Sequence, residues 1–181
     1  MITQTHMTAD EFMAQPESME HVELIAGELI MSPTPKYKHQ SISLNSAVEL
    51  KGKTPHGTVV ISPMDVHLDE ENVVQPDVFW VSGADSLCEL GDDGYWHGAP
   101  DLVVEVLSPS TALRDHGVKF GLYERFGTRE YWLTDPEGEF VEVFHREGDM
   151  LRRFGAFGRN DAFALGVLPH VTVQVSALFA G

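Results

Sequence analysis

The 181-residue chain has little cysteine, few basic residues and no long apolar run. Cys88 is the only cysteine, so no disulfide can form within the chain, and a reducing cytoplasm is the expected location. The segment from Met1 to Pro16 has no basic stretch followed by an apolar one, which argues against a signal peptide. No uncharged apolar stretch reaches the roughly 20 residues that a membrane span requires.

Basic residues are outnumbered by acidic ones. Lys and Arg total 12 and Asp and Glu total 28, giving a formal net charge of −16. Such a surface repels phosphate at long range, and most nucleic-acid-binding proteins are basic. A metal ion in a carboxylate site would reverse the field locally. The one basic stretch, which either contacts a phosphate backbone or is a solvated helix face, contains Lys36, Lys38, Lys51 and Lys53.

Several common catalytic patterns are also missing. The chain has no glycine-rich phosphate loop, no His/Cys spacing typical of zinc sites and no Ser-His-Asp arrangement.

The residue patterns predict one α/β domain over residues 1–181, in which residues 1–35 form a helix and a hairpin appended to the core. Thr8 and Glu11 have the spacing of a capping box, and Ala26-Gly27 joins two short apolar segments as a β-hairpin turn would. Helices are predicted for residues 38–50 and 109–126, and strands for residues 57–61, 64–68, 78–81, 101–107, 130–134, 139–146, 151–154 and 171–175. Residues 82–99 are predicted to be a loop. Strands followed by a helical crossover indicate a mixed sheet with helices on both faces.

Glu105 is anomalous because it interrupts the apolar strand Leu102-Val103-Val104-Glu105-Val106-Leu107. A strand this apolar is typically central and covered on both faces. A buried carboxylate needs a metal ion, a cation or hydrogen bonds to compensate for lost hydration. Glu105 is therefore a candidate metal ligand. The alternatives are an ion-paired core residue, or a solvated residue on an edge strand.

Asp77 and Asp101 both follow a proline at the start of a predicted strand. If the two strands are neighbours, Asp77 and Glu105 lie close enough to share one cation, and Mg²⁺ takes one or two carboxylates with water and phosphate. Asp101 precedes Glu105 by four residues and points to the same face of the strand. It is a weaker candidate, since Pro-Asp is also a turn signal.

The helix after Glu105 supplies a candidate cation. Asp115, Lys119 and Tyr123 are spaced by four residues and form one stripe. Gly117 and Gly121 lie beside this stripe and lower helix stability by about 1 kcal/mol each, a cost that a close approach to the sheet would explain. We expect Lys119 to lean toward the site, held by Asp115 or Glu105. The alternative is a solvent-exposed Asp115–Lys119 pair.

These residues resemble the PD-(D/E)XK, or restriction-endonuclease-like, superfamily. The run from Asp101 through Leu107-Ser108-Pro109-Ser110-Thr111, with Asp115, Lys119, Tyr123, Gly127, Glu130-Tyr131-Trp132 and Asp135-Pro136 downstream, is similar to a large bacterial family of restriction-endonuclease-like proteins. The resemblance covers nearly the whole chain, including a hairpin with Glu23 and Glu28. It implies an αβββαβ core with a central mixed sheet, an extra N-terminal hairpin and extra C-terminal strands. The superfamily places its lysine two residues after the acid, where this chain has Leu107, so the resemblance implies that Lys119 has taken over that role.

The leading hypothesis is Mg²⁺-dependent endonuclease activity, with Mn²⁺ as a substitute metal, on nucleic acid and more specifically DNA. Asp77 and Glu105 would hold the metal, Lys119 would complete the catalytic set, and Asp101, Asp115, Tyr123, Glu28 and His39 are supporting candidates. A second hypothesis, motivated by the net charge and the displaced lysine, is a nuclease-fold binding module with little or no catalysis. A third is a metal-dependent hydrolase of smaller phosphoesters. By analogy with nucleases that cut both strands, a homodimer is expected.

Overall fold

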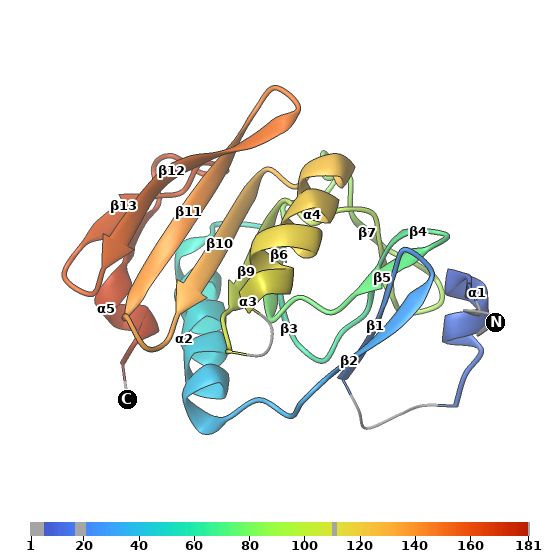
Figure 1. Ribbon diagram of the computed structural model, residues 1–181. Coiled ribbons are helices and arrows are strands. Elements are labelled where there is room, and N and C mark those ends of the chain that lie inside the picture. The colour runs from blue at the N-terminus through green and yellow to red at the C-terminus, as the bar shows by residue number, and fades with distance from the viewer. Residues whose placement is uncertain (1–5, 17–20, 110–111, 181) are drawn as a thin grey trace.

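The computed structural model describes residues 6–16, 21–109 and 112–180. Two six-stranded sheets and a two-stranded sheet account for its strands (Figure 1). The main sheet consists, in spatial order, of β12 (Met150–Gly158), β11 (Phe140–Glu147), β10 (Glu130–Asp135), β9 (Leu102–Val106), β6 (Val78–Val81) and β3 (Thr58–Ile61). Only β9 and β10 run parallel within this sheet, and every other neighbouring pair is antiparallel.

The second sheet is assembled from three separate hairpins of the chain. It consists, in spatial order, of β2 (Glu28–Ser32), β1 (His21–Ile25), β5 (Asn72–Val74), β4 (Val66–Asp69), β8 (Trp96–His97) and β7 (Glu89–Leu90). The predicted hairpin at Ala26-Gly27 is confirmed, and both turn residues have the positive φ that such a tight turn requires. The segment predicted as the loop 82–99 contains the short strands β7 and β8.

Helices cover both faces of the main sheet. The helices are α1 (Ala9–Met13), α2 (Tyr37–Lys53), α3 (Ala112–Arg114), a π-helical turn η1 (Asp115–Lys119), α4 (Phe120–Phe126) and α5 (Val175–Leu178). The capping box predicted at Thr8 and Glu11 is present at the start of α1. No helix of the described ranges is both long and apolar enough to cross a membrane.

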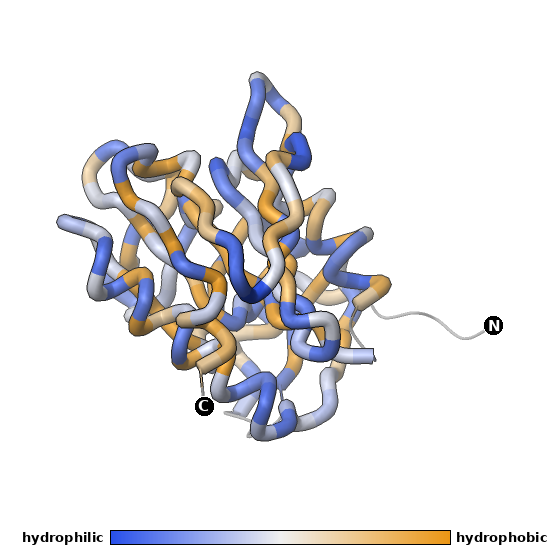
Figure 2. Tube along the Cα trace, turned by 90° about the vertical axis from the view of Figure 1, so that its left-hand side faces the viewer, coloured by the Kyte–Doolittle hydropathy of each residue, from blue (hydrophilic) through white to orange (hydrophobic). Residues whose placement is uncertain are grey.

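The alternation of side chains along β9 divides the core in two. Leu102, Val104 and Val106 pack with α2 and α5 on one face, whereas Val103 packs with α4 and the second sheet on the other. All five residues of β9 are buried, as the apolar run predicted. Figure 2 shows the same distribution along the trace, with apolar segments running through the interior and polar segments gathered in peripheral turns. A charged residue on β9 is therefore largely buried and needs compensating partners within the protein.

The order α2, β3, β6, β9, α3 to α4 and β10 reproduces the predicted αβββαβ core. The strand predicted at residues 64–68 is present as β4 (Val66–Asp69), which belongs to the second sheet. One expectation needs correction. Gly117 and Gly121 do not mark a close approach to the sheet, since both are exposed and a Cβ at either position would meet no atom within 4 Å. Ser110 and Thr111 of the predicted motif lie outside the described residues.

Candidate active site

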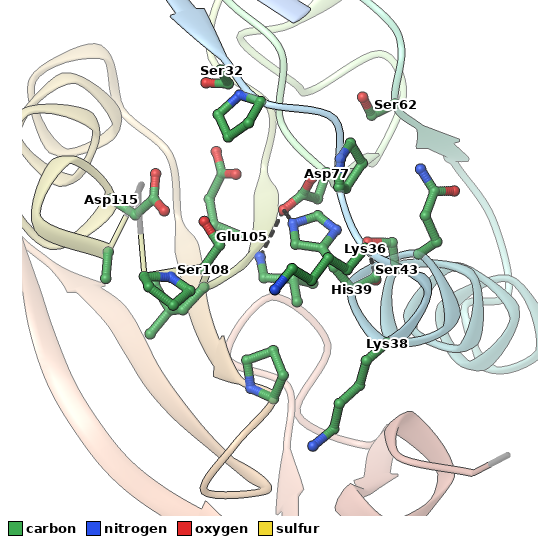
Figure 3. Close-up of a pocket in the computed structure, with 18 of the residues that line it drawn as sticks. Ser32, Lys36, Lys38, His39, Ser43, Ser62, Asp77, Glu105, Ser108 and Asp115 are labelled. Carbon is green, nitrogen blue, oxygen red and sulfur yellow. Dashed lines mark hydrogen bonds and ion pairs between the residues drawn. The ribbon is translucent and has the colours of Figure 1, made fainter.

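A cleft of about 760 Å³ opens where the start of α2 meets β6, β9 and the η1 turn. Asp77, Glu105, Asp115 and Lys119 all line it, as does His39 from the first turn of α2. Figure 3 shows His39, Asp77, Glu105 and Asp115 converging from separate elements, with Asp77 and His39 in contact and Asp115 on the opposite side of Glu105. The cleft therefore gathers most of the residues that the sequence singled out.

Asp77 and Glu105 are brought together by strand pairing. In the antiparallel pair of β6 and β9, Val78 lies opposite Val104, so extending this register by one residue places Asp77 opposite Glu105. Directly opposed residues in such a pair point to the same face, with Cβ atoms about 5 Å apart. Asp77 is 8% exposed and Glu105 is 3% exposed. Two carboxylates are thus held side by side at the floor of the cleft, mostly out of water.

Asp77 is fixed from two directions. The backbone N–H of Val106 donates to its Oδ2 at 2.7 Å, and His39 Nε2 lies 3.2 Å from the same oxygen (Figure 3). Burial by itself lowers the pKa of His39, but the hydrogen bond and the charge of Asp77 outweigh it and raise that pKa. His39 therefore orients the carboxylate of Asp77 at the cleft wall.

Glu105 is held by two groups from the helical segment above the sheet. Lys119 Nζ lies 2.6 Å from its Oε1, and the hydroxyl of Tyr123 donates to the same oxygen at 2.9 Å. Lys119 is 2% exposed, which rules out the alternative of a solvent-exposed Asp115–Lys119 pair. The lysine on the helix therefore reaches the strand carboxylate directly, although it comes from a different element.

The ionisation of these groups follows from burial and from mutual charge. Burial raises the pKa of Glu105 well above its usual range, the carboxylates of Asp77, Asp115 and Glu23 raise it further, and Lys119 only partly opposes them. The pKa of Lys119 is raised in spite of burial, because Glu105, Glu23 and Asp115 surround the ammonium. The ammonium is therefore held in its charged form, and the carboxylates compete for it.

The donor set fits a hard divalent cation. Four carboxylates, those of Glu23, Asp77, Glu105 and Asp115, face two cations, Lys119 and Arg114, which leaves a formal charge of −2 with His39 neutral. Carboxylate oxygens suit Mg²⁺, which needs only one or two of them because water and phosphate complete its shell. Within the described ranges no group of three or more His, Cys, Asp or Glu side chains forms a metal-binding cluster. Asp77 and Glu105 would be the two carboxylates that such an ion needs.

Two supporting candidates lie elsewhere. Asp101 directly precedes β9, and four residues of extended chain separate it from Glu105 by about 13 Å. Its carboxylate accepts from the backbone N–H of Ser82 at 2.8 Å and pairs with Arg129 at 3.3 Å. These contacts hold the N-terminal end of β9 in place. Glu28 is exposed next to the hairpin turn and does not line the cleft. The separation of Asp101 from Glu105 is too large for both carboxylates to bind one metal ion.

Glu23 and Arg114 are the site residues that the sequence analysis missed. Glu23 lies in β1, is fully buried, and its Oε1 is 3.0 Å from Lys119 Nζ. Arg114 lies 3.8 Å from Glu23 Oε2 and donates to Ser32 Oγ at 2.7 Å. A usable signal was present: Glu23 stands in the apolar segment Val22-Glu23-Leu24-Ile25, the same pattern that identified Glu105.

The basic stretch divides between two environments. Lys36 and Lys38 line the cleft at the start of α2 (Figure 3), and Lys38 forms an exposed pair with Glu137 at 3.8 Å. Lys53, at the other end of α2, pairs with Glu49 at 2.6 Å, and Lys51 is exposed outside the cleft. Only the first two lysines are placed to meet a polyanion that enters the cleft.

Comparison with solved structures establishes the fold class. A crystal structure described as a "putative nuclease" from Anabaena variabilis ATCC 29413 matches with a TM-score of 0.77 over 96% of this chain and 97% of that chain, at 20% sequence identity. The fold is therefore restriction-endonuclease-like, as predicted. The Uma2 family model, described as "Putative restriction endonuclease", matches residues 9–176, and the chain belongs to this family. A comparison with curated proteins found no match.

Proposed function

We propose that this protein is a Mg²⁺-dependent endonuclease that hydrolyses phosphodiester bonds of DNA. The observation that carries the proposal is the placement of Asp77 and Glu105 on paired strands in one cleft, with the ammonium of Lys119 2.6 Å from Glu105. Family membership supports a nuclease, and the relative described as a nuclease supports the same reaction class.

Asp77 and Glu105 would hold the metal, with Mn²⁺ as a substitute. When bound, Mg²⁺ would polarise the scissile phosphate and lower the pKa of a bound water. The reaction is attack of water oxygen on phosphorus with cleavage of one P–O ester bond. Lys119 would stabilise the negative charge that develops on the phosphoryl oxygens, because it is a buried, charged donor beside Glu105. His39 and Tyr123 would keep the two carboxylates in place.

Two observations favour a binding module without catalysis. Lys119 already neutralises Glu105, and the described ranges hold no three-residue metal cluster. In such a module the cleft would bind nucleic acid through Lys36 and Lys38, and the buried charges would serve only stability. The two proposals differ in one measurable property, which is the affinity of the cleft for a divalent cation.

Glu105→Gln tests the proposed function while preserving side-chain shape. We expect wild type to bind one or two Mn²⁺ ions by calorimetric titration and to cleave supercoiled plasmid in Mg²⁺. Glu105→Gln should lose Mn²⁺ binding and slow cleavage by more than about 10²-fold, because a ligand charge is removed. Asp77→Asn should behave in the same way.

Glu130→Gln is the matched control. Glu130 is also fully buried on a strand of the main sheet, but its carboxylate accepts from Trp132 Nε1 and from the backbone N–H of Val167, outside the cleft. Its substitution should leave Mn²⁺ binding unchanged. Cleavage by Glu105→Gln at the wild-type rate would refute the catalytic proposal. Absence of Mn²⁺ binding in wild type would favour the binding module.

A further inference from the structure

The ammonium of Lys119 is shared between carboxylates from two different sheets. Its Nζ lies 2.6 Å from Glu105 Oε1 on the main sheet and 3.0 Å from Glu23 Oε1 on the second sheet. Neither contact is a surface pair, because all three side chains are at most 4% exposed. The lysine therefore bridges the sheets at the wall of the cleft.

Glu23 is built into this position by several contacts. The backbone N–H of Gln75, at the end of β5, donates to Glu23 Oε1 at 2.9 Å, and Arg114 lies 3.8 Å from Oε2. Burial, the largest influence, raises the pKa of Glu23, but Lys119 and the Gln75 N–H together outweigh it and lower that pKa. Glu23 Oε2 is buried and accepts no hydrogen bond within the described ranges. The strand thus presents a fixed negative charge to Lys119.

We infer that Glu23 is a positioning residue that shares the ammonium of Lys119 with Glu105 and so keeps the Glu105 carboxylate partly available to a divalent cation. This inference rests on the proposed function for the metal at Asp77 and Glu105. Without the charge of Glu23, Lys119 would pair with Glu105 alone, and the site would lose one of its four negative charges. Both changes oppose binding of a cation. Glu23 acts through Lys119 and does not itself need to touch substrate.

The first test is Mn²⁺ affinity in Glu23→Gln, measured by calorimetric titration on the full chain. Loss of an outer group that orients a metal ligand typically costs 10- to 100-fold in metal affinity, and we expect a loss of that size. The variant keeps the Lys119–Glu105 pair, so it is expected to fold. Glu130→Gln, which removes an equally buried carboxylate outside the cleft, should change affinity less than twofold. Wild-type Mn²⁺ affinity in Glu23→Gln, combined with lost affinity in Glu105→Gln, would overturn this inference and leave the proposed function intact.

The second test needs no metal. In EDTA, Glu23→Gln should lower the melting temperature of wild type, because Lys119 loses a partner. In the Lys119→Gln background the same substitution should cost clearly less, because the ammonium is already gone and only Arg114 remains as a cation beside Glu23. Equal costs in the two backgrounds would show that Glu23 and Lys119 do not interact directly. That result would overturn the pairing even in a protein that binds no Mn²⁺.

Discussion

Tyr123 and Tyr131 are both fully buried, but their hydroxyl groups donate to acceptors of different charge. Tyr123 donates to the Glu105 carboxylate at 2.9 Å, and Tyr131 donates to the backbone carbonyl of Asp115 at 3.1 Å. We expect Tyr123→Phe to lower the free energy of unfolding by about 1.5–3 kcal/mol and Tyr131→Phe by about 0.5–1.5 kcal/mol, because hydrogen bonds to charged groups contribute more. Urea denaturation without metal measures both values. Equal costs would indicate that Glu105 is protonated in the metal-free protein, the form that its raised pKa favours.

For individual residues, the sequence predicts burial better than it predicts which side chains a buried residue contacts. A carboxylate within an apolar strand signals burial, and Glu105 is buried as expected. The partners of that carboxylate come from residues 14 and 18 positions later, and spacing alone left a solvent-exposed lysine as an alternative. Glu23 carries the same signal, yet the site prediction named Glu28 from that hairpin. The catalytic and metal-binding roles of Asp77, Glu105 and Lys119 stay predictions.

Two glycines of the helix beside the cleft should respond to alanine in opposite directions. Gly121 lies inside α4 and is exposed, and a Cβ there would meet no atom within 4 Å, so Gly121→Ala should raise the free energy of unfolding by about 0.5–1 kcal/mol. Gly127 ends α4 with φ of 101°, and its Cβ would lie 2.8 Å from Leu87 Cδ1. Gly127→Ala should therefore destabilise the protein by at least about 1 kcal/mol.

Thermal denaturation of the two variants checks this prediction. Stabilisation by Gly127→Ala would contradict the left-handed helix end. Destabilisation by Gly121→Ala would contradict the open space beside this position.

Helix and strand positions were predictable where one face is apolar, and less so where the element is short or irregular. The predicted helix over residues 109–126 contains the π-helical turn η1, which holds both Asp115 and Lys119. Such wide turns occur often at functional sites, but an apolar pattern interrupted by glycine does not specify one. The two-residue strands β7 and β8 were missed for a related reason, since two residues are too few to show an alternation.

For the molecule as a whole, the net charge of −16 predicts a weak dependence of DNA binding on salt. Lys36 and Lys38 are exposed cations of the cleft, and exposed pairs such as Lys38–Glu137 contribute little and can yield to a phosphate. With about two phosphate contacts, the slope of log K against log salt concentration should be about −2 for duplex DNA. Fluorescence anisotropy in EDTA with a labelled duplex measures this slope.

Matched lysine variants locate the contacts behind that slope. Lys36→Ala and Lys38→Ala should each reduce its magnitude by about 1, whereas Lys51→Ala, an exposed lysine at the far end of α2, should not change it. A slope of about −6 or steeper would show that the contact with DNA extends well beyond the cleft. The predicted homodimer would be one source of such contacts, and sedimentation of the free protein tests it.

The second sheet joins segments that lie far apart in the chain. Its strands come from three separate hairpins, two of which are connections within the αβββαβ core, and connections ordinarily vary freely between relatives. Here the β1 hairpin carries Glu23, and the β4–β5 hairpin leads to the Gln75 N–H that holds it. A chimera that replaced one hairpin alone would therefore disturb the surroundings of a lysine on a distant helix. A recombinant that preserves the cleft therefore has to receive these hairpins together. The segments that must be exchanged as one are defined by their contacts and not by their continuity in the sequence.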